Sequence, residues 1–297
     1  MLRATFTGEQ VEYSEVFMST SNLTKKVTLS TLNQMTSEGE KFTCLTAYDY
    51  TFAKLISDCG VESILVGDSL GMVVQGHDST LPVSIEQMAY HTAAVKRGND
   101  RALLITDMPF MSYATTDTAL KNAGELMQAG AEMVKLEGGE WLCDTVAQLA
   151  NNGVPTCLHL GLTPQSVNKF GGFKVQGRSQ QGADKILNDA KALEEAGADI
   201  LLLECIPADL ATELTRSVSI PVIGIGAGAN TDAQVLVQYD MLGLNQGHVA
   251  KFVKDYLAAA QENPDPSEPN LYRRAIQMFV DEVKQGTYPG PEHSFSR

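Results

Sequence analysis

Residues 128–139, QAGAEMVKLEGG, hold the pattern that decides the fold. Gly130 stands where the last turn of a helix would end, and glycine readily takes the left-handed conformation that stops a helix. An apolar run suited to a strand follows and ends at Glu137 and two glycines. The same succession of helix end, glycine and strand occurs at 151–157, NNGVPTC, and at 195–201, EAGADIL. The chain therefore alternates helices with strands.

Eight apolar runs of strand length follow one another from residue 42 onward, and the last is weaker than the others. They are FTCLTAYD (42–49), SILVGDS (63–69), ALLITDMPF (102–110), EMVKLEGG (132–139), PTCLHLG (155–161), DILLLECI (199–206), PVIGIGAG (221–228) and QVLVQYDML (234–242). Such runs are typical of parallel strands covered on both faces. The segments between them, such as Asp117–Ala129 and Ala183–Ala196, have helical spacing. The pattern predicts a (β/α)₈ TIM barrel; an open doubly wound sheet is the alternative, but it normally uses fewer strands.

The composition excludes several classes of protein. The 297 residues carry a formal net charge of −14, which disfavours a nucleic-acid partner. No stretch has the roughly 18 consecutive apolar residues of a membrane-spanning helix. The five cysteines form no CxxC pair, as expected of reduced thiols in a cytoplasmic protein. Glu9, Glu12 and Glu15 argue against a signal or transit peptide. We expect a cytoplasmic protein that acts on small molecules.

The domain organisation predicted from the sequence is simple. Residues 1–24 are expected to be a loosely ordered N-terminal extension, and residues 25–297 a single barrel domain. A Pro-rich connector at 261–270 leads to a final helix, roughly Leu271–Gln285.

Two inter-strand segments, residues 71–101 and 162–182, are longer than a single helix requires. In a barrel both would lie on the catalytic face, so both are candidate lids or binding loops. The run IGIGAG (223–228) is only a weak match to a dinucleotide fingerprint. It belongs to the seventh unit, whereas the fingerprint opens the first, so we predict no NAD site.

Acidic residues end several of the strand-like runs, among them Asp68, Asp107 and Glu137. They could be ordinary turn residues. Alternatively they form a metal site, because a lone carboxylate buried in such surroundings costs several kcal/mol. Oxygen ligands favour Mg²⁺, with Mn²⁺, Co²⁺ or Zn²⁺ as possible substitutes. A 2-oxo acid could then chelate the metal, which would stabilise an enolate.

Four further strand-end residues each have a functional and a structural interpretation. Lys135 could bind a substrate carboxylate or form a salt bridge, and Ser69 could bind substrate or cap a turn. Glu204, directly after three leucines, suits a general base that removes a proton alpha to a ketone, or a buried salt bridge. His159 could line the site or be a core histidine.

Longer motifs in the chain carry a family resemblance. They are TAYDYTFAKL, VGDSLGMVVQGHDSTLPV, YHTAAVKRG, DMPFMSY, MVKLEGGEW, HLGLTPQSVNKFGGFKVQGR, LLECIP, PVIGIGAG and YPGPEHSF. In this order they resemble the 3-methyl-2-oxobutanoate hydroxymethyltransferase (ketopantoate hydroxymethyltransferase) family over about residues 28–296. The resemblance implies a TIM barrel of the phosphoenolpyruvate/pyruvate superfamily, a homodecamer and one Mg²⁺ per subunit.

The resemblance also implies a reaction and a role for each site residue. A hydroxymethyl group would pass from 5,10-methylenetetrahydrofolate to 3-methyl-2-oxobutanoate, giving 2-dehydropantoate and tetrahydrofolate in pantothenate biosynthesis. Glu204 would be the catalytic base. The metal ligands would be Asp68, Asp107 and Glu137, and the substrate-binding residues would be Ser69, Asp68, Asp107, Lys135 and His159. Two other functions remain open: a folate-independent lyase of the same superfamily, and a non-catalytic metal- or ligand-binding barrel.

Overall fold

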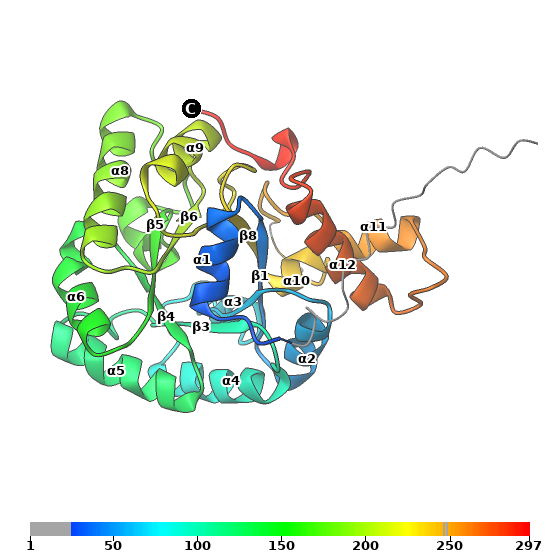
Figure 1. Ribbon diagram of the computed structural model, residues 1–297, viewed down its shortest axis with the longest axis horizontal. Helices are drawn as coiled ribbons and strands as arrows, with labels where there is room; N and C mark the ends of the chain where they lie inside the picture. Colours follow the sequence, from blue (N-terminus) through cyan, green and yellow to red (C-terminus); the bar gives the residue numbers. More distant parts are fainter. Residues whose placement is uncertain (1–24, 246, 248) are drawn as a thin grey trace, which may run out of the picture.

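Eight parallel strands close into a barrel in the computed structural model, which describes residues 25–245, 247 and 249–297 (Figure 1). They are β1 (Phe42–Thr46), β2 (Ser63–Val66), β3 (Leu103–Asp107), β4 (Met133–Glu137), β5 (Thr156–Gly161), β6 (Ile200–Glu204), β7 (Val222–Ile225) and β8 (Ala233–Leu236). Each strand pairs with the next, and β8 pairs with β1. The predicted barrel is confirmed and the open sheet is excluded. The expected extension, residues 1–24, lies outside the described residues.

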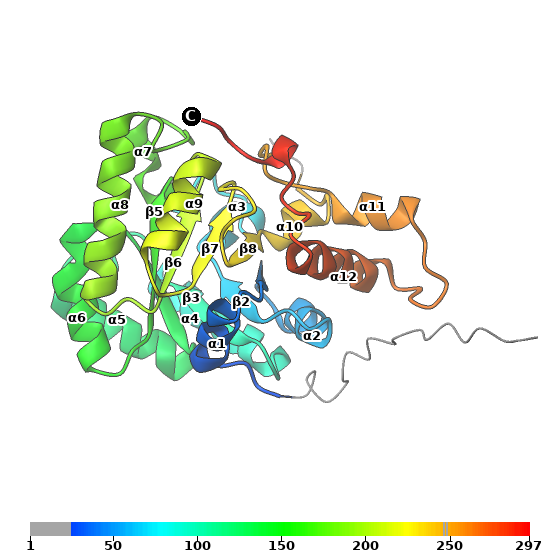
Figure 2. The same ribbon diagram turned by 45° about the horizontal axis from the view of Figure 1, so that its top comes forward.

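Helices surround the barrel (Figure 2). They are α1 (Leu29–Ser37), α2 (Tyr50–Asp58), α3 (Leu70–Val73), α4 (Ile85–Gly98), α5 (Thr116–Ala129), α6 (Cys143–Asn151), α7 (Val167–Phe170), α8 (Gln180–Glu195), α9 (Ala208–Ser217), α10 (Gln238–Met241), α11 (Tyr256–Glu262) and α12 (Leu271–Lys284), with short 3₁₀ turns η2 (Glu140–Leu142), η3 (Pro164–Ser166) and η4 (Pro291–His293). Within the described part of the chain, no helix is both long and apolar enough to cross a membrane.

Glycines end three helices as the sequence predicts. Gly130, Gly153 and Gly197 all have positive φ, at 116°, 75° and 103°. This left-handed conformation lets the chain leave each helix and enter the next strand within a few residues. The repeated helix–glycine–strand pattern is therefore the local cause of the barrel's regular winding.

Two predicted boundaries are wrong. The apolar run 234–242 is not one strand, because β8 ends at Leu236 and α10 begins at Gln238. The backbone N–H of Gln238 donates to the Thr46 side chain at 2.9 Å, which takes it out of the strand pairing. The connector 261–270 also starts later than predicted, since α11 continues to Glu262.

The C-terminal segment returns to the mouth of the barrel after α12. Helix α12 packs on β1, α2 and α11 (Figure 1). The chain then runs to Phe295, whose carbonyl accepts a hydrogen bond from the Ala208 N–H at 2.9 Å. Because Ala208 begins α9 just after β6, this bond places the chain end beside the carboxyl ends of the strands.

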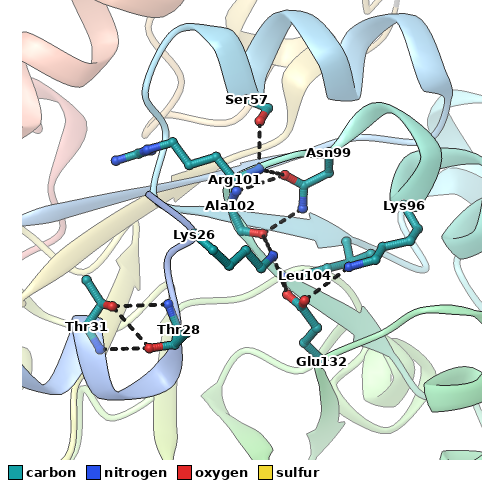
Figure 3. A network of polar contacts seen from close by, with 10 residues as sticks. All are labelled: Lys26, Thr28, Thr31, Ser57, Lys96, Asn99, Arg101, Ala102, Leu104 and Glu132. Carbon is teal, nitrogen blue, oxygen red and sulfur yellow. Dashed lines mark hydrogen bonds and ion pairs between the residues drawn. The ribbon is translucent and has the colours of Figure 1, made fainter. Parts of the chain in front are cut away.

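A network of charged groups fixes the opposite end of the barrel (Figure 3). Glu132, just before β4, accepts from Lys26 at 2.7 Å, from Lys96 at 3.1 Å and from the Leu104 N–H at 3.0 Å. Lys26 also donates to the Ala102 carbonyl at 2.7 Å. Burial alone would raise the pKa of Glu132, but its bonds to Lys26, Leu104 and Lys96 lower it overall. This carboxylate therefore ties the segment before α1 to β3, β4 and α4.

Replacing Glu132 with Ala should lower the free energy of unfolding by about 1–3 kcal/mol, because two ammonium groups lose their counterion and a backbone N–H loses its acceptor. The lowered pKa means that this stabilisation is present above the ordinary glutamate pKa of about 4.3 and is lost as the pH falls through the lower folded value. Urea unfolding at pH 7 and at acid pH measures both effects. The matched control is Glu40→Ala, at an exposed glutamate; an equal loss there would contradict the prediction.

Candidate active site

The carboxyl ends of the strands bring the residues singled out from the sequence into one cavity of about 680 Å³. Asp107, Glu137 and Glu204 are the last residues of β3, β4 and β6. The residues singled out from the sequence that line this cavity are Asp68, Ser69, Asp107, Lys135, Glu137, His159 and Glu204. Asp107 on β3 is the register partner of Lys135 on β4, and Glu137 on β4 is the partner of His159 on β5. The pairing of the strands therefore places these charged side chains next to one another.

Lys135 forms a buried ion pair with Asp107. Its Nζ lies 2.7 Å from Asp107 Oδ1 and 3.8 Å from Glu137 Oε1, and the Lys135 side chain is only 4% exposed. Burial lowers the pKa of Lys135, but Asp107, Glu137 and Asp68 together outweigh it and raise the pKa overall. The lysine therefore remains charged and supplies a fixed cation at the floor of the cavity.

His159 lies between two carboxylates. Its Nδ1 is 3.3 Å from Glu137 Oε1, and its Nε2 is 3.2 Å from Glu204 Oε2. Burial and the nearby Lys135 lower the pKa of His159, but Glu137 and Glu204 raise it more, to about 9. The imidazole is therefore an imidazolium at neutral pH, and it couples the ends of β4 and β6. Of its two partners, Glu204 is the more open to the cavity, with a side chain 16% exposed against 2% for Glu137.

The Asp68 carboxylate is buried close to other negatively charged side chains. Its backbone N–H donates to Asp107 Oδ2 at 2.9 Å, and its own Oδ2 accepts from Gln165 Nε2 at 2.8 Å. Burial, and then the charges of Asp107 and Glu137, raise the pKa of Asp68 well above its usual range. At the strand ends, the carboxylates of Asp68, Asp107, Glu137 and Glu204 thus lie among two cationic side chains, Lys135 and His159. This excess of negative charge adds to the effect of burial on the pKa of Asp68.

The predicted metal ligands have other partners in this structure. Across residues 25–245, 247 and 249–297, no group of three or more His, Cys, Asp or Glu side chains has an arrangement that could hold a metal. Glu137 has a neighbour at each oxygen, because its Oε2 accepts from the Gln165 N–H at 2.9 Å and its Oε1 lies 3.3 Å from His159 Nδ1. The donor chemistry nevertheless suits a divalent cation, since Asp68 and Asp107 offer buried oxygens in a site with excess negative charge.

The sequence did not indicate three of the polar residues that support the site. Tyr48 places its hydroxyl 2.8 Å from Ser69 Oγ, so Ser69 has a specific partner, although its side chain does not cap α3. Gln165 contacts Asp68 and Glu137, and Tyr113 donates to Gln165 Oε1. No spacing or composition signal marks these residues, because their role depends on loops folding over the strand ends.

Both long inter-strand segments reach the cavity. The 162–182 segment contributes Leu162, Pro164, Phe173 and Val175 to its wall, and the 71–101 segment contributes residues that include His77. The C-terminal Phe295 also lines it. The cavity therefore combines the charged side chains of the strand ends with apolar and aromatic side chains from these segments.

Comparison with known proteins decides the family. The family model described as ketopantoate hydroxymethyltransferase matches residues 26–291.

The chain belongs to the ketopantoate hydroxymethyltransferase family.

A 3-methyl-2-oxobutanoate hydroxymethyltransferase from Marinomonas sp. (strain MWYL1) is 58% identical over 277 residues, which cover 93% of this chain and 98% of that protein. The protein of the same name from Shewanella amazonensis (strain ATCC BAA-1098 / SB2B) is 57% identical over 271 residues, 91% of this chain and 99% of that one. The resemblance found in the sequence is confirmed, and so is the expectation of an enzyme of this family.

Solved structures of other enzymes share the barrel. A phosphonopyruvate hydrolase in complex with oxalate and Mg²⁺ has a TM-score of 0.58 at 15% identity, covering 88% of this chain and 98% of that one. A 2,3-dimethylmalate lyase, described as a PEP mutase/isocitrate lyase superfamily member, has a TM-score of 0.53 at 13% identity, with coverages of 88% and 98%. These likenesses agree with the predicted barrel fold.

The buried Lys135–Asp107 ion pair predicts that the stability of the protein depends strongly on both residues. Lys135→Met should lower the free energy of unfolding by about 3–5 kcal/mol, because it leaves Asp107 buried without its cation. The double variant Lys135→Met/Asp107→Asn removes both charges and should recover part of that loss. Urea unfolding in EDTA measures the cycle. Losses that simply add would show that the two groups do not interact.

Proposed function

We propose that the chain transfers a hydroxymethyl group from 5,10-methylenetetrahydrofolate to 3-methyl-2-oxobutanoate, giving 2-dehydropantoate and tetrahydrofolate. Membership of the ketopantoate hydroxymethyltransferase family places the enzyme in pantothenate-pathway hydroxymethyl transfer. The observation that carries the finer proposal is the position of Glu204. It is the carboxylate of the His159 pair that opens to the cavity, at the end of an apolar strand.

Mg²⁺ is the proposed cofactor, one per subunit, held by Asp68 and Asp107 with Glu137 as the third carboxylate. The support is chemical: oxygen donors, burial and an excess of negative charge. When bound, the ion would supply positive charge that favours an enolate over the ketone. The phosphonopyruvate hydrolase with Mg²⁺ and oxalate, a small dicarboxylate, is a precedent on the same kind of barrel.

The chain's own residues would bind the oxo acid and move its proton. Lys135 supplies a fixed positive charge near the substrate carboxylate, and the Ser69 hydroxyl, held by Tyr48, can donate to it. Glu204 removes the C3 proton of 3-methyl-2-oxobutanoate. His159 lies between Glu204 and Glu137, where it fixes the position of the Glu204 carboxylate and lines the substrate site. The resulting carbon nucleophile attacks the one-carbon unit of the folate and breaks one of its two C–N bonds. Water then displaces the other nitrogen and supplies the product hydroxyl, while the C3 proton and one water proton pass to the two nitrogens of the departing tetrahydrofolate.

We also propose a cytoplasmic homodecamer whose catalytic domain comprises residues 25–297, with residues 1–24 as an extension outside it. The family match that begins at residue 26 supports the division, and free cysteines support a reducing compartment. Light scattering of the purified protein tests the assembly. Turnover by a chain that lacks residues 1–24 tests the division, and loss of that turnover would contradict it.

The reaction itself is tested with 3-methyl-2-oxobutanoate, Mg²⁺ and 5,10-methylenetetrahydrofolate, with 2-dehydropantoate measured by mass spectrometry. We expect product only when all three are present, and none with EDTA. Product that forms without the folate would indicate a lyase and contradict the proposal.

Glu204→Gln should slow deuterium exchange at C3 of the oxo acid by at least about 100-fold, because the amide cannot accept the proton. Binding of Mg²⁺ and of the oxo acid should persist, since Glu204 is not a proposed ligand of either. Exchange followed by NMR and binding followed by calorimetry separate the two effects. Glu213→Gln, at an exposed position on α9, is the matched control, and normal exchange in Glu204→Gln would remove Glu204 from its role.

A further inference from the structure

Gln165 connects three strand ends through one side chain and one backbone N–H. It lies in η3, at the start of the 162–182 segment, and is 7% exposed. Its Nε2 donates to Asp68 Oδ2 at 2.8 Å and to the Met108 carbonyl at 3.0 Å. Its backbone N–H donates to Glu137 Oε2 at 2.9 Å. A single loop residue therefore contacts carboxylates that follow β2 and end β4.

The acceptors beside Gln165 fix which way its amide points, and Tyr113 supports that orientation. The amide NH₂ faces Asp68 Oδ2 and the Met108 carbonyl, which accept its two hydrogen bonds. On the other side, the Tyr113 hydroxyl donates to Gln165 Oε1 and accepts the Glu137 N–H at 3.3 Å. The opposite orientation would place the amide oxygen against a carboxylate oxygen and lose both bonds.

The ring of Tyr113 is itself held in place. Trp141 stacks on it with a centroid distance of 6.4 Å and an interplanar angle of 17°. The same indole lies over Gly138, where an added Cβ would come within 2.6 Å of a ring atom. Because Gly138 follows Glu137 directly and Trp141 lies in η2, the indole connects the turn after β4 to Tyr113, which lies between β3 and α5.

We infer that Gln165 is a positioning residue that holds the carboxylates of Asp68 and Glu137 in place for a divalent cation, and that the Tyr113 hydroxyl stabilises the direction of its amide. The inference rests on the proposed function. Like-charged carboxylates in a buried cavity repel one another and would rotate apart without donors to hold them. By binding one oxygen of Asp68, Gln165 directs the other oxygen toward a ligand.

The test compares Gln165→Leu with Gln180→Leu, a matched change at an exposed glutamine at the end of the same segment. Calorimetric titration with Mg²⁺ should show about 10- to 100-fold weaker binding in Gln165→Leu, the range found when the groups that orient metal ligands are removed. Gln180→Leu should bind Mg²⁺ as the unmodified chain does. Thermal unfolding in EDTA establishes that each variant is folded.

Tyr113→Phe gives a second, milder variant that keeps the ring beside Trp141 and removes only the hydroxyl. Tyr113→Phe should weaken Mg²⁺ binding less than Gln165→Leu does. If Gln165→Leu does not fold, the Mg²⁺ affinity of Tyr113→Phe tests the inference in its place. Folded variants that bind Mg²⁺ as tightly as Gln180→Leu would overturn the inference, even if their unfolding temperatures fall. If the unmodified chain itself binds no Mg²⁺, the proposed function fails, and the inference that rests on it fails too.

Discussion

Like charges buried at one end of a barrel are the constraint on which the rest of the structure depends. At the strand ends, Asp68, Asp107, Glu137 and Glu204 lie close to Lys135 and His159. Lys135 neutralises part of the charge through Asp107, and His159 does so through two glutamates. The remaining excess of negative charge adds to the effect of burial in raising the pKa of Asp68. A divalent cation would remove this excess, and the chemistry that we propose depends on that property.

The scaffold keeps this arrangement from relaxing. Each charged residue is at or near the end of a strand whose register is fixed by its neighbours, so the repelling groups cannot move apart without breaking the barrel. The network around Glu132 fastens the opposite end of β3 and β4, the two strands that carry the Lys135–Asp107 pair. The network thus holds the two strands in place at one end while the site at the other end contains unbalanced charge.

The sequence predicted the barrel well because its signals are local. Glycines after helices and apolar runs ending in acids mark several of the units, and residues at strand ends of a barrel must share one face. Where a signal was ambiguous the prediction was wrong, as at 234–242, whose apolar pattern spans β8 and α10. The pairing of His159 with two glutamates and the bridging position of Gln165 could not be read from the chain. Both depend on distances across strands and loops, which no sequence spacing encodes.

The location of the cation tests this account most directly. Crystals grown with Mn²⁺ and 3-methyl-2-oxobutanoate would reveal the ion by anomalous scattering. The account predicts one strong peak within bonding distance of the Asp68 and Asp107 carboxylates, on the side that opens to the cavity. An empty cavity at saturating Mn²⁺, or a peak remote from both carboxylates, would contradict it.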